Sequence, residues 1–144
     1  MTKIIELLES EFSLSTENIN KALAFQADFG GRIESILENM GVIDESNIAH
    51  LYSLYFQLKL FTAKDFDENG FTLVDKPVVQ NKLNKYGWIL ISKGEEQDKI
   101  LTCNPFNVSA NQYILKYFPT TELAIMQRSD IDSIIKHNSH LSES

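Results

Sequence analysis

The chain has 144 residues, is 43% hydrophobic and carries a net charge of −7. This length suits one domain or two small ones, and the composition can fill a hydrophobic core. No apolar run approaches the roughly 18–20 residues of a membrane span, so we expect no direct membrane insertion. Both halves of the chain are acidic, and neither offers the basic stripe that nucleic-acid binding requires.

The location follows from two further observations. Acidic residues interrupt the apolar N-terminal run, which does not fit a signal peptide, and the single cysteine, Cys103, excludes an internal disulfide framework. We therefore expect a cytoplasmic protein.

The first sixty residues have the apolar spacing of helices. Ser15 and Asp44 are placed to cap helices, and Gly41 is placed to end one. The paired glycines within 28–31 predict a turn. The expected helices cover residues 2–11, 15–27, 32–40 and 44–59.

A duplication organises this part of the chain. Residues 3–26 align with residues 32–55 at an offset of 29 positions, with five identities in 24 and apolar residues that coincide. The connector is 27–31. Each copy reads as a short helix, a tight turn and a longer helix, and neither copy can bury its apolar face alone. The two helical hairpins are therefore expected to pack on each other.

The second part of the chain changes in pattern. Residues 61–75 read as an irregular connector, with Asn69-Gly70 as a turn signal. Residues 76–138 then predict helices and short apolar strands in the order α-β-β-α-β-α, and residues 139–144 predict a disordered tail. The fold class is thus α+β, with N-terminal all-α tandem helical hairpins over 1–60 followed by a small α/β sandwich subdomain.

Catalytic motifs are absent from the sequence. It has no phosphate-binding loop of the G-x-x-x-x-G-K-[S/T] type, no G-x-S-x-G nucleophile elbow and no H-E-x-x-H helix. The three histidines lie far from close metal-ligand spacing. We therefore expect no catalytic residues, no metal ligands and no enzymatic activity.

The doubled hairpin resembles the N-terminal module of the assembly ATPases of type II secretion and type IV pili. In that family a motif R-L-G-x-x-L-x-x-x-G, closed by Q after 24 residues, occurs twice around a five-residue connector and binds cyclic di-GMP. The later stretches GWILISKGEEQDKILTCNPFN and YFPTTELAIMQRSDIDSII also resemble the second subdomain of the family. The resemblance covers nearly the whole chain.

The resemblance implies a set of cyclic di-GMP-binding positions: Lys3, Ile4, Gln26, Arg32, Ile33 and Gly41. The chain departs from the motif at other positions. The third-position glycine is Ile5 in one copy and Glu34 in the other, the tenth-position glycine is Phe12 in the first copy, and the closing glutamine is Tyr55 in the second. The same six residues also fit a purely structural interpretation, in which they build the core, end a helix or lie on solvated faces.

The function implied by the resemblance is that of a non-catalytic adaptor or regulatory module. It would dock to the cytoplasmic domain of an inner-membrane platform protein and so lie peripheral to the inner membrane through that partner. An aromatic cluster offers partner-binding candidates: Tyr52, Tyr55, Phe56 and Phe61. Two alternatives are a cyclic di-GMP receptor domain, with that dinucleotide as the only ligand, and a regulatory segment fused to another enzyme such as a glycosyltransferase.

Overall fold

The computed structural model describes residues 2–138, and the chain divides into two compact units between Gln57 and Leu58. Each unit is described by itself. The predicted tail at 139–144 lies outside the described residues. Within the described part, eight helices and a five-stranded sheet confirm the predicted α+β class.

The first unit is entirely helical in its regular structure. It contains α1 (Thr2–Glu11), α2 (Thr16–Phe29), α3 (Ile33–Asn39) and α4 (Glu45–Phe56). The predicted caps are confirmed: Ser15 Oγ accepts a hydrogen bond from the Asn18 amide at 3.1 Å, and Asp44 forms a reciprocal capping box with Asn47. Gly41 follows α3 with φ +77°, a conformation that favours glycine.

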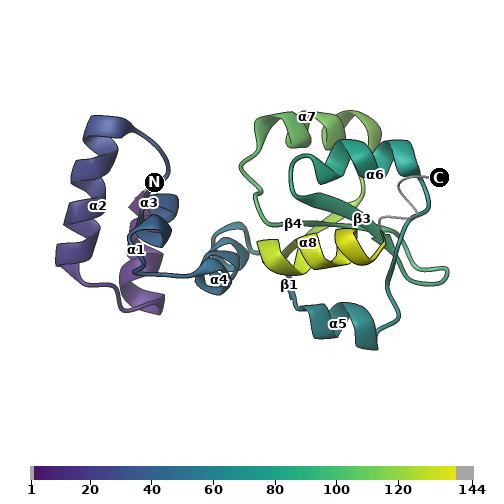
Figure 1. Cartoon of the computed structure of the whole chain (residues 1–144), viewed down its shortest axis with the longest axis horizontal. Coiled ribbons are helices and arrows are strands. Elements are labelled where there is room, and N and C mark those ends of the chain that lie inside the picture. Colours follow the sequence, from purple (N-terminus) through teal and green to yellow (C-terminus); the bar gives the residue numbers. More distant parts are fainter. Residues whose placement is uncertain (1, 139–144) are drawn as a thin grey trace. The chain divides into compact units, whose positions relative to one another are not determined.

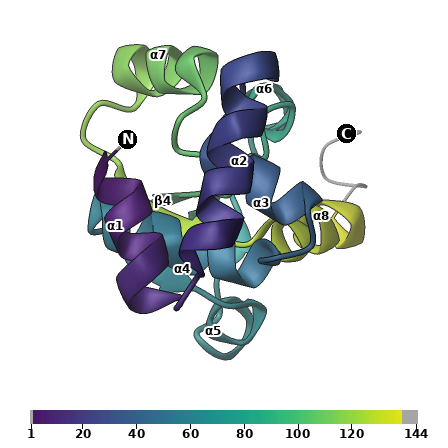
Figure 2. The ribbon, with the colours of Figure 1, turned by 90° about the vertical axis from the view of Figure 1, so that its left-hand side faces the viewer.

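The two hairpins of this unit pack on each other as expected. Helix α2 lies against α3, and α1 lies against α4 (Figure 2). Apolar residues at equivalent positions of the two predicted repeats are buried: Ile4, Ile33 and Leu37 have no exposed surface, and Leu8 is 1% exposed. The spacing of apolar residues predicted these helices because the apolar positions form the buried face of each helix.

The second unit is built on a mixed sheet. Its elements are β1 (Leu60–Phe61), α5 (Ala63–Glu68), β2 (Thr72–Leu73), α6 (Pro77–Asn84), β3 (Trp88–Ser92), β4 (Lys99–Thr102), α7 (Val108–Tyr117), β5 (Glu122–Met126) and α8 (Arg128–His137). The strand order is β1-β5-β4-β3-β2. Strands β1 and β4 run parallel to β5, whereas β3 is antiparallel to both β2 and β4.

Helices cover both faces of this sheet (Figure 1). Residues of β3 alternate between the faces, so that Trp88 and Leu90 join one core while Ile89 and Ile91 join the other. Helices α6 and α7 close the face that holds Trp88, and α5 and α8 close the opposite face. The unit is therefore a three-layer sandwich with two apolar cores.

The segment 57–75 differs from the expectation. Helix α4 ends at Phe56 rather than near residue 59, because Gln57 adopts a left-handed conformation with φ +56°. The predicted connector 61–75 instead contains part of β1, α5 and β2, so the observed order has two strands and one helix more than α-β-β-α-β-α. Strands of two residues carry no alternation of apolar and polar side chains, which is the signal that marks longer strands in a sequence.

Candidate ligand and partner sites on the helical unit

Two of the six predicted ligand residues lie in the core. Ile4 and Ile33 are fully buried, which favours a packing role for both side chains. Their assignment as ligand contacts stays a prediction. An isoleucine that packs in the core at each aligned position agrees with the structural interpretation, in which these residues build the core.

Three other predicted ligand residues have local roles. Gln26 donates from Nε2 to the Gly31 carbonyl oxygen at 2.8 Å and so stabilises the turn between α2 and α3. Gly41 is exposed at the end of α3. Lys3 is exposed, and its Nζ lies 5.9 Å from the centre of the Tyr55 ring. Among these three residues, Lys3 and Gly41 are open to a ligand.

Arg32 pairs with a buried carboxylate. Its Nε donates to both oxygens of Glu34, at 3.1 Å to Oε1 and 2.9 Å to Oε2, and the Glu34 side chain has no exposed surface. The Tyr52 hydroxyl, which comes from α4, donates to Glu34 Oε2 at 3.1 Å. We call these three residues the Arg32–Glu34–Tyr52 cluster.

The electrostatics of this cluster favour a neutral phenol and a compensated carboxylate. The pKa of Tyr52 is raised above the usual tyrosine range, mainly because the Tyr52 hydroxyl is buried and further because Glu34 is negatively charged. Glu34 lies in the first turn of α3, where the helix dipole favours a negative charge. The cluster joins α3 to α4, so its chemistry is structural: it neutralises one buried charge with one cation and one hydroxyl.

The sequence analysis identified Glu34 as a departure from the motif and did not predict its burial. A glutamate is rarely buried unless it is paired. The Arg32 two residues before it was a usable signal for such pairing, but Tyr52 lies 18 residues away and no local pattern connects it.

Two of the four predicted partner-binding aromatics are also buried. Tyr52 is 4% exposed within the cluster, and Phe61 is 2% exposed in the sheet unit, where it packs with the α5 and α8 core. Both side chains therefore offer little surface to a partner, and their assignment as partner contacts stays a prediction. Tyr55 and Phe56 are half-buried, and their rings meet edge to face with centres 4.9 Å apart.

An exposed pair of aromatic side chains lies on α2. Phe25 is 49% exposed and Phe29 is 74% exposed, and their ring centres are 4.7 Å apart. The two residues are four positions apart and therefore share one helix face. That spacing was readable in the sequence, but exposure was not, because a phenylalanine pair on one helix face is ordinarily part of a core.

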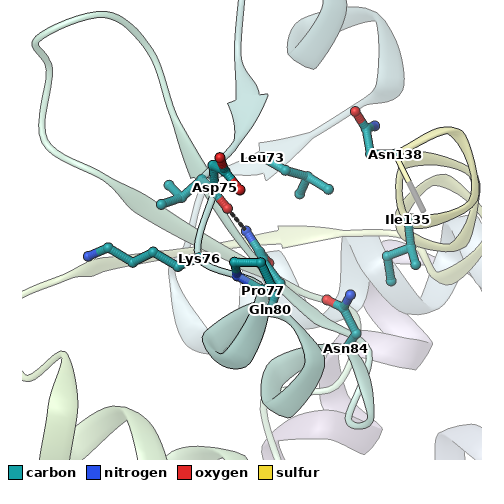
Figure 3. A pocket seen from close by; sticks show the side chains of 9 residues that line it. Leu73, Asp75, Lys76, Pro77, Gln80, Asn84, Ile135 and Asn138 are labelled. Carbon is teal, nitrogen blue, oxygen red and sulfur yellow. Dashed lines mark hydrogen bonds between the residues drawn. The ribbon is translucent and has the colours of Figure 1, made fainter. Parts of the chain in front are cut away.

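The sheet unit contains a small cavity of about 10 Å³ between α6, α8 and the segment after β2 (Figure 3). Asn84 Oδ1 on its wall is buried and has no hydrogen-bond partner among residues 2–138. This volume fits one water molecule and is too small for a dinucleotide. Gln80 also lines the cavity, and its Nε2 donates to the backbone oxygens of Val74 and Leu90 at 2.9 and 2.6 Å.

The described residues form no group of three or more histidine, cysteine, aspartate or glutamate side chains that could hold a metal ion. Along residues 2–138, no helix is both long enough and apolar enough to cross a membrane.

Comparison with known proteins gives structural matches only. Neither the protein-family models nor the curated protein sequences contain a match to the chain. The chain is similar to a structure of MshE with cdg, with a TM-score of 0.73, 16% identity, and coverage of 93% of this chain and 96% of that one.

The N-terminal domain of XpsE is similar as well, in two crystal forms. The TM-scores are 0.67 and 0.56, the identities are 17% and 21%, and each match covers 94% of this chain. The XpsE domain is covered over 92% and 93% of its length. The resemblance to the N-terminal module of secretion and pilus assembly ATPases is therefore confirmed at the level of the fold: this chain has the fold of the XpsE N-terminal domain.

Proposed function

We propose that this chain is a non-catalytic adaptor module that docks to the cytoplasmic domain of an inner-membrane platform protein of a secretion or pilus machine. The observation that carries the proposal is the match to the XpsE N-terminal domain, which extends over both units and 94% of the chain. The match covers nearly the whole of the XpsE domain as well as nearly the whole of this chain. The sequence of this chain contains no phosphate-binding loop motif for nucleotide hydrolysis.

The docking surface that fits this proposal is the Phe25–Phe29 pair on α2. Two adjacent phenyl rings in water are costly to leave exposed, and aromatic residues are enriched at the energetic centres of protein interfaces. Burying the exposed parts of both rings would contribute about 3 kcal/mol to binding. We prefer this pair to the predicted cluster, because Tyr52 and Phe61 of that cluster are buried.

The test is a calorimetric titration of the chain with the cytoplasmic domain of an inner-membrane platform protein from the same organism. We expect saturable binding that the Phe25→Ala/Phe29→Ala variant weakens by about a hundredfold. The matched control is Val108→Ala/Leu115→Ala, which removes two apolar side chains that are 67% and 74% exposed on α7. Absence of binding by the unaltered chain would refute docking, and equal losses in both variants would refute the assigned surface.

A second candidate function is that of a cyclic di-GMP receptor. The observation that favours it is the similarity, at a TM-score of 0.73, to a structure of MshE with cdg. Against it, the Arg32 guanidinium is already paired with Glu34, which also stands at the third motif position. A bidentate contact to guanine would compete with that pair.

The receptor function is tested by calorimetry with cyclic di-GMP. Heat of binding that disappears in Lys3→Ala, a change at an exposed side chain, would support a receptor. No heat at high micromolar ligand would end this candidate. The adaptor proposal stands or falls separately, because it is measured with the protein partner.

A further inference from the structure

An open groove lies along the outer side of α6 and α7, on the layer that covers one face of the sheet. Its volume is about 510 Å³. The α6 residues form one stripe at helical spacing, and two α7 tyrosines form the other wall. The lining residues are Val78, Asn81, Lys82, Lys85, Tyr113 and Tyr117. We call this feature the α6–α7 groove.

The groove is positively charged in an acidic protein. Two of its six lining residues, Lys82 and Lys85, are basic and none of the six is acidic. Lys116 precedes the lining residue Tyr117 in α7, which contains no acidic residue. The chain as a whole has a net charge of −7. In the described part of the chain, Lys82, Lys85 and Lys116 are exposed and none of them forms an ion pair with a carboxylate.

Two of these charges are positioned by the tyrosines. Lys82 Nζ lies 6.0 Å from the centre of the Tyr113 ring, and Lys116 Nζ lies 5.2 Å from the centre of the Tyr117 ring. Such contacts hold an ammonium group over an aromatic face without neutralising it. The tyrosines also lie against each other, with ring centres 4.9 Å apart.

Apolar surface accompanies the charge. Val78 is 82% exposed and Tyr117 is 56% exposed, so the groove presents an aliphatic contact and an aromatic contact beside its lysines. A partner that matches both features carries carboxylates together with aliphatic or aromatic side chains. Because α6 has eight residues, it spans about 12 Å, or roughly two turns of a bound helix.

We propose that the α6–α7 groove binds an acidic segment of a partner protein, with carboxylates on Lys82 and Lys85 and an apolar side chain between Val78 and Tyr117. Charge complementarity favours this occupant over a nucleic acid, since two lysines in the groove of a protein of net charge −7 give little attraction to a long polyanion. The proposal lies on the sheet unit and does not depend on docking through Phe25 and Phe29.

The test uses two fluorescein-labelled peptides of about twelve residues that differ only in charge. One alternates glutamate pairs with leucines, and the other has lysine in place of each glutamate. Fluorescence anisotropy with the full chain at low salt should show saturable binding of the acidic peptide and none of the basic one. Raising the salt should weaken binding, because the contacts are exposed ion pairs.

Charge-reversal variants locate the site. Lys82→Glu/Lys85→Glu should weaken binding of the acidic peptide by tenfold or more, since it converts two attractions into two repulsions. The matched control Lys64→Glu/Lys136→Glu makes the same change in net charge at exposed lysines of α5 and α8 and should weaken it less than threefold. Circular dichroism verifies that all variants are folded.

Three results would overturn the proposal. The first is equal binding of the acidic and basic peptides, or no binding of the acidic peptide. The second is equal weakening in the two charge-reversed variants. The third is a different occupant: either an oligo-dT that binds more tightly than the acidic peptide, or self-association in sedimentation that Lys82→Glu/Lys85→Glu abolishes. A negative result with the platform protein would leave this site untouched.

Discussion

Replacing Arg32 with alanine removes the cation that compensates a fully buried carboxylate. In the folded chain Arg32 Nε donates to both oxygens of Glu34, and only the Tyr52 hydroxyl supplies a further donor in the cluster described above. Breaking a buried ion pair on one side costs about 3–5 kcal/mol. Because the Arg32 side chain is 34% exposed, water can approach Glu34 in the variant, so we expect the lower end, about 3 kcal/mol.

A double-mutant cycle separates the charge from the packing. The Glu34→Gln change removes the buried charge and keeps an oxygen that can accept from Tyr52, so Arg32→Ala/Glu34→Gln should recover about 1–2 kcal/mol relative to Arg32→Ala alone. The matched control is Lys21→Ala, which breaks the exposed ion pair with Glu17 and should cost less than about 0.5 kcal/mol.

The assay is urea denaturation followed by far-ultraviolet circular dichroism. Tryptophan fluorescence is unsuitable here, because the single tryptophan, Trp88, is buried in β3 of the sheet unit and does not report on the unit that contains Arg32. A loss below about 1 kcal/mol in Arg32→Ala would refute a structural role for Arg32. A double variant no more stable than Arg32→Ala would refute the buried charge as the cause.

Three further predictions concern single side chains. Burial and the charge of Glu34 raise the pKa of Tyr52, so the protonated phenol stabilises the fold below the usual tyrosine pKa of 10.0, and this stabilisation is lost as the pH rises through the raised pKa. Ultraviolet titration of the folded protein should therefore leave one of the five tyrosines un-ionised until alkaline unfolding. Tyr52→Phe should not reduce the absorbance change of the folded protein. Gly87→Ala should lower the free energy of unfolding by about 2–3 kcal/mol, because Gly87 has φ +78° and the added Cβ would lie 2.8 Å from Cys103 Sγ. The control Gly70→Ala, at φ +72° with no atom nearby, should lower it by only about 1–2 kcal/mol. Equal losses in denaturation monitored by tryptophan fluorescence would refute the clash. Gln80→Leu should lower the free energy of unfolding by about 2–3 kcal/mol. In the unaltered chain the buried Leu90 amide donates to Gln80 Oε1 at 3.2 Å, and the variant removes that acceptor. A loss below about 1 kcal/mol in the same assay would mean that another acceptor replaces Gln80.

The long elements of the fold were predictable because their signals are local. Ser15 and Asp44 cap the helices that their positions predict, Pro77 is the first residue of α6, and the run from Trp88 is the strand β3. For the two caps the controlling hydrogen bond lies three residues from the signal, and β3 is long enough to show the apolar run of a buried strand. The strands β1 and β2 were not predictable, since two residues become a strand only when the distant β5 or β3 supplies the hydrogen bonds.

The candidate site was less predictable than the fold. Family resemblance correctly indicated the architecture, but it gave no sign that Ile4 and Ile33, which it marked as ligand contacts, are fully buried. It also left Glu34 without a partner, because the pairing with Tyr52 depends on how α3 and α4 meet. Side chains that share an element are visible to periodicity, whereas a buried polar contact between elements requires the tertiary structure.

The strand order has a consequence for synthesis of the chain. Among residues 2–138, strand β1 pairs with β5 alone, so Leu60 and Phe61 leave the ribosome about 65 residues before their partners at Ile125 and Met126. At translation rates of roughly 5–20 residues per second, this apolar pair waits about 3–13 s for its place in the sheet. The four helices of the first unit, by contrast, are all present once Gln57 has emerged. The nascent chain thus exposes one edge of an unfinished sheet next to a helical unit whose sequence is complete, and chaperones that bind extended apolar segments would meet the protein at Leu60 and Phe61.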